Sequence, residues 1–96
     1  MTRNDFVFTI GFDGPAAVID GQAMKKYKSL STKELAEKGL FRAAYSSALY
    51  SKDPKEMEAL IAVYNKLAGT NLTVNSPLDR LFGVFLIDDV KRTIVL

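Results

Sequence analysis

The side chains of this chain that could act on a charged partner are gathered in one short lysine cluster. The cluster spans residues 25–33 and contains Lys25, Lys26, Lys28 and Lys33. The chain has no acidic residue between Asp20 and Glu34, and Tyr27 lies among the lysines. Clustered lysines beside an aromatic ring are typical of contacts with a phosphate backbone, because each lysine displaces a bound counterion. The sequence therefore offers nucleic-acid or phosphate-ligand binding as one alternative function.

An ordinary solvated surface segment explains the same lysine cluster equally simply. The formal net charge of the chain is only +2, which does not by itself indicate an acidic partner. Arginine, which makes bidentate hydrogen bonds to phosphates and base edges, is scarce in this sequence. The few arginines are Arg3, Arg42, Arg80 and Arg92. We therefore rank nucleic-acid binding below a role in protein interaction.

Catalytic chemistry has few residue types to use in this sequence. The chain has no Cys, no His and no Trp. This composition excludes disulfides, thiol nucleophiles, Ser-His-Asp triads and zinc sites built from Cys or His. Catalysis by carboxylates would need a pair in an apolar setting, and no spacing in the chain singles out such a pair. We expect a binding protein rather than an enzyme, with no cofactor.

Acidic residues and tyrosines leave two further sites to consider. Asp88 and Asp89, together with Asp13 and Asp20, could in principle hold a hard cation. Adjacent aspartates in a strand point to opposite faces, however, so the pair at 88–89 indicates a polar turn and we expect no metal site. A ligand-binding or enzymatic pocket between a sheet and helices is a second alternative function. Its lining would come from Tyr27, Tyr50 or Tyr64.

The elements that would position these residues begin with a β-hairpin over residues 5–20. Apolar residues alternate from Phe6 to Phe12 with a period of two, which predicts a strand. Asp13 and Gly14 follow, and this dipeptide favours a two-residue turn because both residues tolerate a positive φ. Pro15 lacks an N–H group and is therefore placed at the start or edge of the returning strand.

Two helices are predicted in the middle of the chain. Residues 22–30 are undecided between a short helix and an ordered loop. Ser31 and Glu34 match a capping box, which predicts a helix from about residue 31 to about residue 50. Asp53 and Pro54 then start a second helix, and Glu56 completes a second capping box with Asp53. Gly69 ends this helix. The link at residues 51–53 is short, so we expect an antiparallel pair of helices.

The C-terminal part predicts a loop at 70–76, a short helix at 78–82 closed by Gly83, and strands at 84–87 and 92–96. The resulting order is ββ-αα-(short α)-ββ. This order predicts an α+β fold, in which a small antiparallel sheet of two hairpins carries the helix pair on one face. With 96 residues we expect a single globular domain over 1–96.

Apolar residues on the first long helix predict an interaction surface. Phe41, Tyr45 and Leu49 are spaced four apart and form a second ridge beside the stripe that faces the core. An exposed apolar ridge of this kind indicates a partner site. Val95, on a final strand expected at a sheet edge, is a second candidate contact. We therefore expect a non-catalytic interaction protein, either a homodimer or a module that docks a protein partner.

No segment of this sequence predicts insertion in a membrane. The apolar stretch near the N-terminus runs only from Phe6 to Ile10 and contains Thr9, so it is shorter than the apolar region of a signal peptide. No apolar run approaches the length of about 20 residues that a membrane helix needs. We therefore expect a cytoplasmic location.

Overall fold

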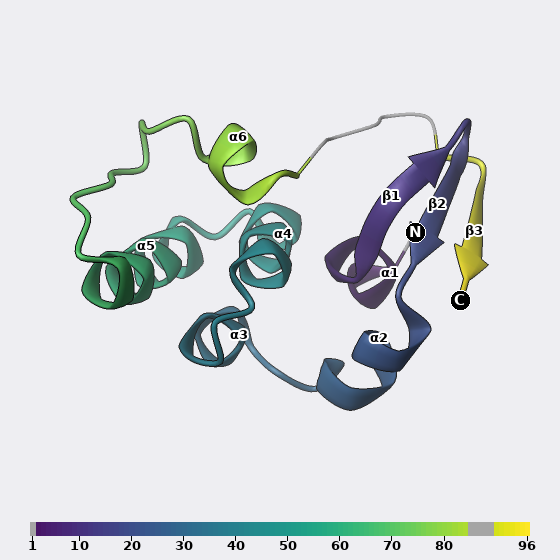
Figure 1. The fold of residues 1–96 in the computed structure, drawn as a ribbon, viewed down its shortest axis with the longest axis horizontal. Coiled ribbons are helices and arrows are strands. Elements are labelled where there is room, and N and C mark those ends of the chain that lie inside the picture. The colour runs from purple at the N-terminus through teal and green to yellow at the C-terminus, as the bar shows by residue number, and fades with distance from the viewer. Residues whose placement is uncertain (1, 85–89) are drawn as a thin grey trace.

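The computed structural model describes residues 2–84 and 90–96. In this part of the chain there are six helices and a mixed three-stranded sheet, so the protein is a small α+β protein. The helices are α1 (Arg3–Val7), α2 (Gly21–Tyr27), α3 (Thr32–Glu37), α4 (Phe41–Ser51), α5 (Pro54–Ala68) and α6 (Leu78–Phe82). The strands are β1 (Thr9–Asp13), β2 (Ala16–Ile19) and β3 (Arg92–Val95), and they lie in the order β1-β2-β3. Figure 1 shows the sheet at one end of the molecule and the α3–α5 helices at the other.

The first part of the expected hairpin is a helix rather than a strand. Thr2 is the N-cap of α1, and its hydroxyl accepts from the Asp5 N–H at 3.2 Å. The Asp5 carboxylate in turn accepts from the Thr2 N–H at 3.3 Å. This reciprocal capping box satisfies two N–H groups at the helix start. It outweighs the period-two pattern, so the strand prediction was wrong for residues 5–8.

The hairpin itself is confirmed, with a turn one residue later than expected. Strands β1 and β2 are antiparallel, and Asp13 pairs with Ala16, so Gly14 and Pro15 form the turn. Gly14 has a φ of 58°. Proline fixes its own φ near −65°, which excludes a type I′ turn and fits the second position of a type II′ turn. A bulge between Thr9 and Gly11 adds one residue, Ile10, to β1.

The single helix expected over residues 31–50 is divided into α3 and α4. The capping box of Ser31 and Glu34 is confirmed at the start of α3. Gly39 then adopts a φ of 78°, a left-handed conformation that ends a helix. A methyl group added at Gly39 would meet nothing within 4 Å, so close packing does not require a glycine there. The conformation of Gly39, and not close packing, explains this glycine.

The second long helix and its ends follow the sequence closely. Asp53 caps α5 through the Lys55 N–H at 2.9 Å, and Gly69 ends the helix with a φ of 68°. The predicted box partner, Glu56, does not complete the cap: its carboxylate accepts a hydrogen bond from Thr32 instead. The loop at 70–76 and the short helix α6, closed by Gly83, are also confirmed. Helices α3, α4 and α5 pack on one another.

The sheet is mixed, so the prediction of a fully antiparallel sheet was wrong. Strand β3 runs parallel to β2, with Ala16 opposite Arg92 and Ile19 opposite Val95. A parallel pair needs a long connection, and here helices α2 to α6 lie between the two strands in the sequence. Most of the strand expected at 84–87, and the turn expected at Asp88 and Asp89, lie outside the described residues. Figure 1 shows α3 to α6 on one side of the sheet and α2 beyond the end of β2.

Most of the hydrophobic core lies among the helices, and Ile19 of β2 joins it from the sheet. Ile19 of β2, Leu35 of α3 and Leu60 of α5 have no solvent exposure. Three aromatic rings, from Phe41, Tyr64 and Phe82, close the core on the α6 side through edge-on and stacked contacts. Aromatic side chains bury large apolar areas, which lets a chain of this size form a core without cross-links.

Candidate functional site

An open cavity of about 300 Å³ lies between α2 and the start of α4. Its floor is the short stretch that leaves α1 and enters β1. Its walls are mainly apolar and include Val7, Phe8, Ile10, Ala23, Leu40 and Phe41. Cavities that hold small molecules are typically apolar with a few polar groups, and about 300 Å³ is at the lower end of their size range.

Local sequence features hold the walls of this cavity in place. Asp20 caps α2 by accepting from the Ala23 N–H at 3.1 Å, which directs α2 away from β2 and over the cavity. The left-handed Gly39 turns the chain between α3 and α4, so that Leu40 and Phe41 reach the opposite wall. Ile10 lines the cavity from the bulge in β1. The cavity therefore depends on a cap, a helix break and a bulge.

Polar groups lie among the lining residues of the cavity. They belong to Thr9, Asp20, Tyr27 and Arg42. The Thr9 hydroxyl donates to the Asp5 carbonyl at 2.6 Å, so its proton is already used. Leu40, the N-cap of α4, has no side-chain acceptor for the first N–H groups of that helix. An apolar molecule with one or two polar groups matches this lining better than a fully polar one.

The predicted ridge on α4 is not an exposed surface. Tyr45 is 5% exposed and belongs to the core, while Phe41 and Leu49 are half-buried. Phe41 packs edge-on against Tyr64 of α5 at 4.9 Å between ring centroids. Tyr45 packs against Phe82 of α6 at 5.2 Å. The prediction of an exposed ridge was wrong because α5 and α6 cover this side of α4.

The Tyr45 hydroxyl is also fixed by a specific contact. It donates a hydrogen bond to the Asp79 carboxylate at the start of α6. Burial raises the pKa of the Tyr45 phenol well above its usual value, and the hydrogen bond to Asp79 and its negative charge raise it further. Tyr45 therefore ties α4 to α6 as a neutral phenol, which is a structural role.

Val95 is the exposed member of the predicted partner-binding set. It is 60% exposed on β3, the last strand in the order of the described sheet. The neighbouring Leu96 is 71% exposed. The backbone of β3 pairs with β2 on one side, so its other side is an edge among the described strands.

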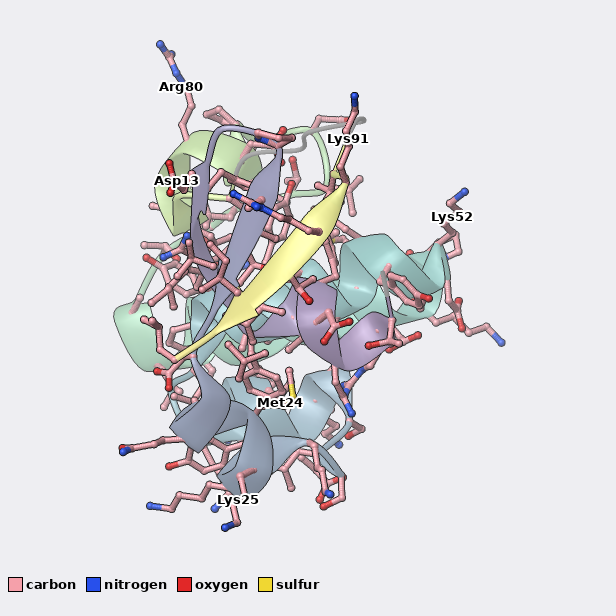
Figure 2. All side chains as sticks on the ribbon, turned by 90° about the vertical axis from the view of Figure 1, so that its right-hand side faces the viewer. Asp13, Met24, Lys25, Lys52, Arg80 and Lys91 are labelled. Atoms are coloured by element: carbon pink, nitrogen blue, oxygen red, sulfur yellow. The ribbon has the colours of Figure 1, made fainter. Side chains whose placement is uncertain are left out.

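The predicted lysine cluster forms an exposed end of the molecule. All four lysines are exposed, and they lie at the end of α2, just after it and in α3. Lys26 lies over the Tyr27 ring at 5.3 Å, and Figure 2 shows Lys25 directed away from the body of the protein. The Arg3 guanidinium binds the Lys28 carbonyl at 3.2 Å and the Leu30 carbonyl at 2.7 Å. These bonds anchor the segment that carries the lysines.

The three tyrosines proposed for a pocket lie in different places. Tyr27 lines the cavity between α2 and α4. Tyr50 lies near Phe6 of α1, with 6.0 Å between the ring centroids. Tyr64 packs on Phe41 and Phe82. The structure therefore brings only Tyr27 of the three to this cavity.

A partly buried chain of polar side chains, which sequence reasoning missed, joins four helices. It runs from Arg3 in α1 through Ser47 in α4 and Thr32 in α3 to Glu56 in α5. Arginine can only donate and a carboxylate can only accept, and each hydroxyl has one proton. The chain therefore has a single direction: Arg3 donates to Ser47 (3.0 Å), Ser47 to Thr32 (2.8 Å), and Thr32 to Glu56.

This polar chain is a structural feature rather than a reaction site. Thr32 is 1% exposed and Ser47 is 4% exposed, so a substrate could not reach either hydroxyl. Hydrogen bonds in such a chain polarise one another and hold the packed helices in one arrangement. No sequence motif indicates the chain, because its members are far apart in sequence.

Metal and membrane chemistry find no support in the described residues. Within residues 2–84 and 90–96, no three acidic, Cys or His side chains gather closely enough to hold a metal ion. Asp88 and Asp89, which we considered as metal ligands, lie outside this range. No helix in the same part of the chain is long and apolar enough to span a membrane.

Comparisons with known proteins add no functional information. No protein-family model, curated protein or solved structure gives a significant match to this chain. The fold class is that of a small α+β protein.

Proposed function

We propose that this protein acts by binding, without a reaction of its own, and that its cavity between α2 and α4 holds a small, mostly apolar molecule. The observation that carries this proposal is the cavity itself, with a volume of about 300 Å³ and mainly apolar walls from three stretches of the chain, 7–10, 20–27 and 39–43. A pocket between the sheet and the helices is one of the two alternative functions expected from the sequence. The apolar ridge on α4 is not proposed as the binding surface, because Tyr45 is buried.

The cavity indicates a modest affinity and a small ligand. A small ligand gains up to about 1.5 kcal/mol per non-hydrogen atom in the best cases and far less in ordinary ones. A compact aromatic or branched aliphatic molecule would therefore bind in the micromolar to millimolar range. The polar side chains Asp20, Tyr27 and Arg42 would select its orientation rather than supply most of the affinity.

A fluorescence titration with N-phenyl-1-naphthylamine, a neutral apolar dye, tests the proposal. We expect saturable binding with one site per chain. Ala23→Leu places a larger side chain at the cavity wall and should weaken binding at least tenfold. Ala62→Leu makes the same change at an exposed position of α5 and should leave binding unchanged. Non-saturable binding, or equal binding by the Ala23→Leu variant, would contradict the proposal.

Self-association is a second candidate function, and the exposure of Val95 favours it. Val95 and Leu96 present apolar side chains at the β3 edge, where another chain could approach. The occupant we propose is a second copy of this chain, in keeping with the homodimer expected from the sequence. Sedimentation equilibrium tests this candidate by measuring mass against concentration. A mass equal to the monomer up to about 1 mM would contradict it.

A further inference from the structure

The sheet has an outer face on which no described helix lies. Phe12 of β1 lines a small hollow with Phe6 of α1 and Ser46 of α4, and Ile19 of β2 is fully buried. These residues therefore mark the inner face. Successive residues of a strand point to opposite faces, and cross-strand neighbours share a face. Val18 and its neighbours consequently point outward, and Figure 2 shows the strands in front of α1 and α4.

Two rows of cross-strand neighbours make up this outer face. The first row has charged ends, Asp13 in β1 and Arg92 in β3, and Ala16 of β2 between them is fully buried. The apolar row is Gly11, Val18 and Ile94. Asp13 and Arg92 are exposed and lie two strand spacings apart, roughly 9.5 Å. Each row thus has different groups at its two ends.

Each row is complementary to the same row of a second copy that is related to the first by a twofold axis. When two such faces pack with the axis parallel to the strands, β1 of one copy faces β3 of the other, and each row faces the same row. Asp13 then faces the second copy's Arg92, and this pair occurs twice. Ile94 faces Gly11, where an added methyl would meet nothing within 4 Å of its own chain. An axis across the strands would instead place both charges against apolar residues.

We infer that a second copy of this chain docks face to face on the outer sheet face, with Asp13 paired to Arg92 and Ile94 packed over Gly11. This inference rests on the proposed self-association, but it places the contact on the outer face and not at Val95, which pairs with Ile19 and lies on the other face of β3. The face measures only about 14 Å by about 13 Å from its strand spacing and rise. This area is well below the roughly 800 Å² that each partner buries in a standard interface, so the dimer is weak.

Sedimentation equilibrium from about 10 µM to about 1 mM tests the surface with Gly11→Lys. In the monomer this lysine would point into open space, because a Cβ at Gly11 meets nothing within 4 Å and its φ is not in the left-handed range. In the dimer it would displace Ile94, so we expect dimerisation to weaken at least tenfold with an unchanged melting temperature. Thr93→Lys adds the same charge to the exposed opposite side of β3 and should not weaken the dimer.

Charge-reversal variants distinguish dimerisation through the outer sheet face from self-association through another surface. Asp13→Arg and Arg92→Asp should each weaken the dimer about tenfold, because each change acts at both symmetry-related pairs, and the double variant should restore it. A dimer that is unchanged in all these variants overturns the proposed surface but leaves self-association intact. A wild-type protein that stays monomeric to about 1 mM overturns both.

Discussion

The buried polar chain from Arg3 to Glu56 yields a sharp stability prediction at Thr32. Thr32→Val removes one hydroxyl and keeps the branched shape of the side chain. It deletes the hydrogen bond to the Glu56 carboxylate, a charge-assisted bond of about 1.5–3 kcal/mol, and deprives the buried Ser47 hydroxyl of its acceptor, about 0.5–1.5 kcal/mol. Glu56 is half-buried, so water replaces part of the loss. We expect a decrease of about 2 kcal/mol in the free energy of unfolding.

Urea denaturation followed by far-ultraviolet circular dichroism measures this change. The midpoint should fall while the slope stays the same, and the melting temperature should drop by about 8–16 °C for a domain of this size. Thr93→Val is the matched control, because Thr93 is exposed on β3, and it should change stability by less than about 0.5 kcal/mol.

A double-mutant cycle with Ser47→Ala tests whether the hydroxyls act as one chain. Because Thr32 and Ser47 share a hydrogen bond, their two substitutions together should cost less than the sum of the single costs. A Thr32→Val variant within about 0.5 kcal/mol of the wild type would refute the reasoning, since a buried chain of this kind could not then stabilise the helices.

Three further predictions concern Tyr45, Gly39 and the lysine cluster. The pKa of Tyr45 is raised by folding, so its stabilising contribution is complete below the unfolded value of 10.0 and declines as the pH rises above it. Stability measured by denaturation from pH 9 to about pH 11 should therefore fall less in Tyr45→Phe than in the wild type. Gly39→Ala should cost about 1–2 kcal/mol because of the positive φ, whereas Gly11→Ala should be neutral or stabilising; equal thermal shifts for the two would contradict this account. The lysine cluster of Lys25, Lys26, Lys28 and Lys33 is tested by a mobility-shift assay. We expect micromolar protein to cause no shift of nucleic acid at about 50 mM salt. A shift that is abolished when all four lysines are replaced by Gln would support the nucleic-acid alternative.

Local signals in the sequence predicted most element ends but not how the elements pack. The capping box at Ser31 and the helix caps at Asp53 and Gly69 each depend on residues within one helical turn of one another. They could therefore be recognised directly in the sequence. The break at Gly39 was missed, and one helix was predicted over 31–50, because a glycine that ends a helix and a glycine within a helix look the same in a sequence. The parallel pairing of β3 with β2 depends on contacts between distant segments.

The candidate site could be predicted only in outline for the same reason. Sequence reasoning placed Tyr27 among three tyrosines of a pocket, but the cavity also needs Phe8, Ala23 and Leu40 from separate elements. The expected ridge failed because α6 folds back over Tyr45, and the bond to Asp79 that holds it there spans 34 residues. Apolar spacing on one helix cannot show which neighbour will cover it.

Amide chemical shifts report whether the cavity between α2 and α4 binds a small apolar molecule. The ¹H–¹⁵N spectrum would be recorded during titration with N-phenyl-1-naphthylamine. The account predicts saturable shifts that are largest at Ile10, Ala23 and Leu40, which line the cavity, and negligible at Lys66 and Leu67 of α5. Shifts spread evenly over the protein, or centred on residues outside the cavity, would contradict it.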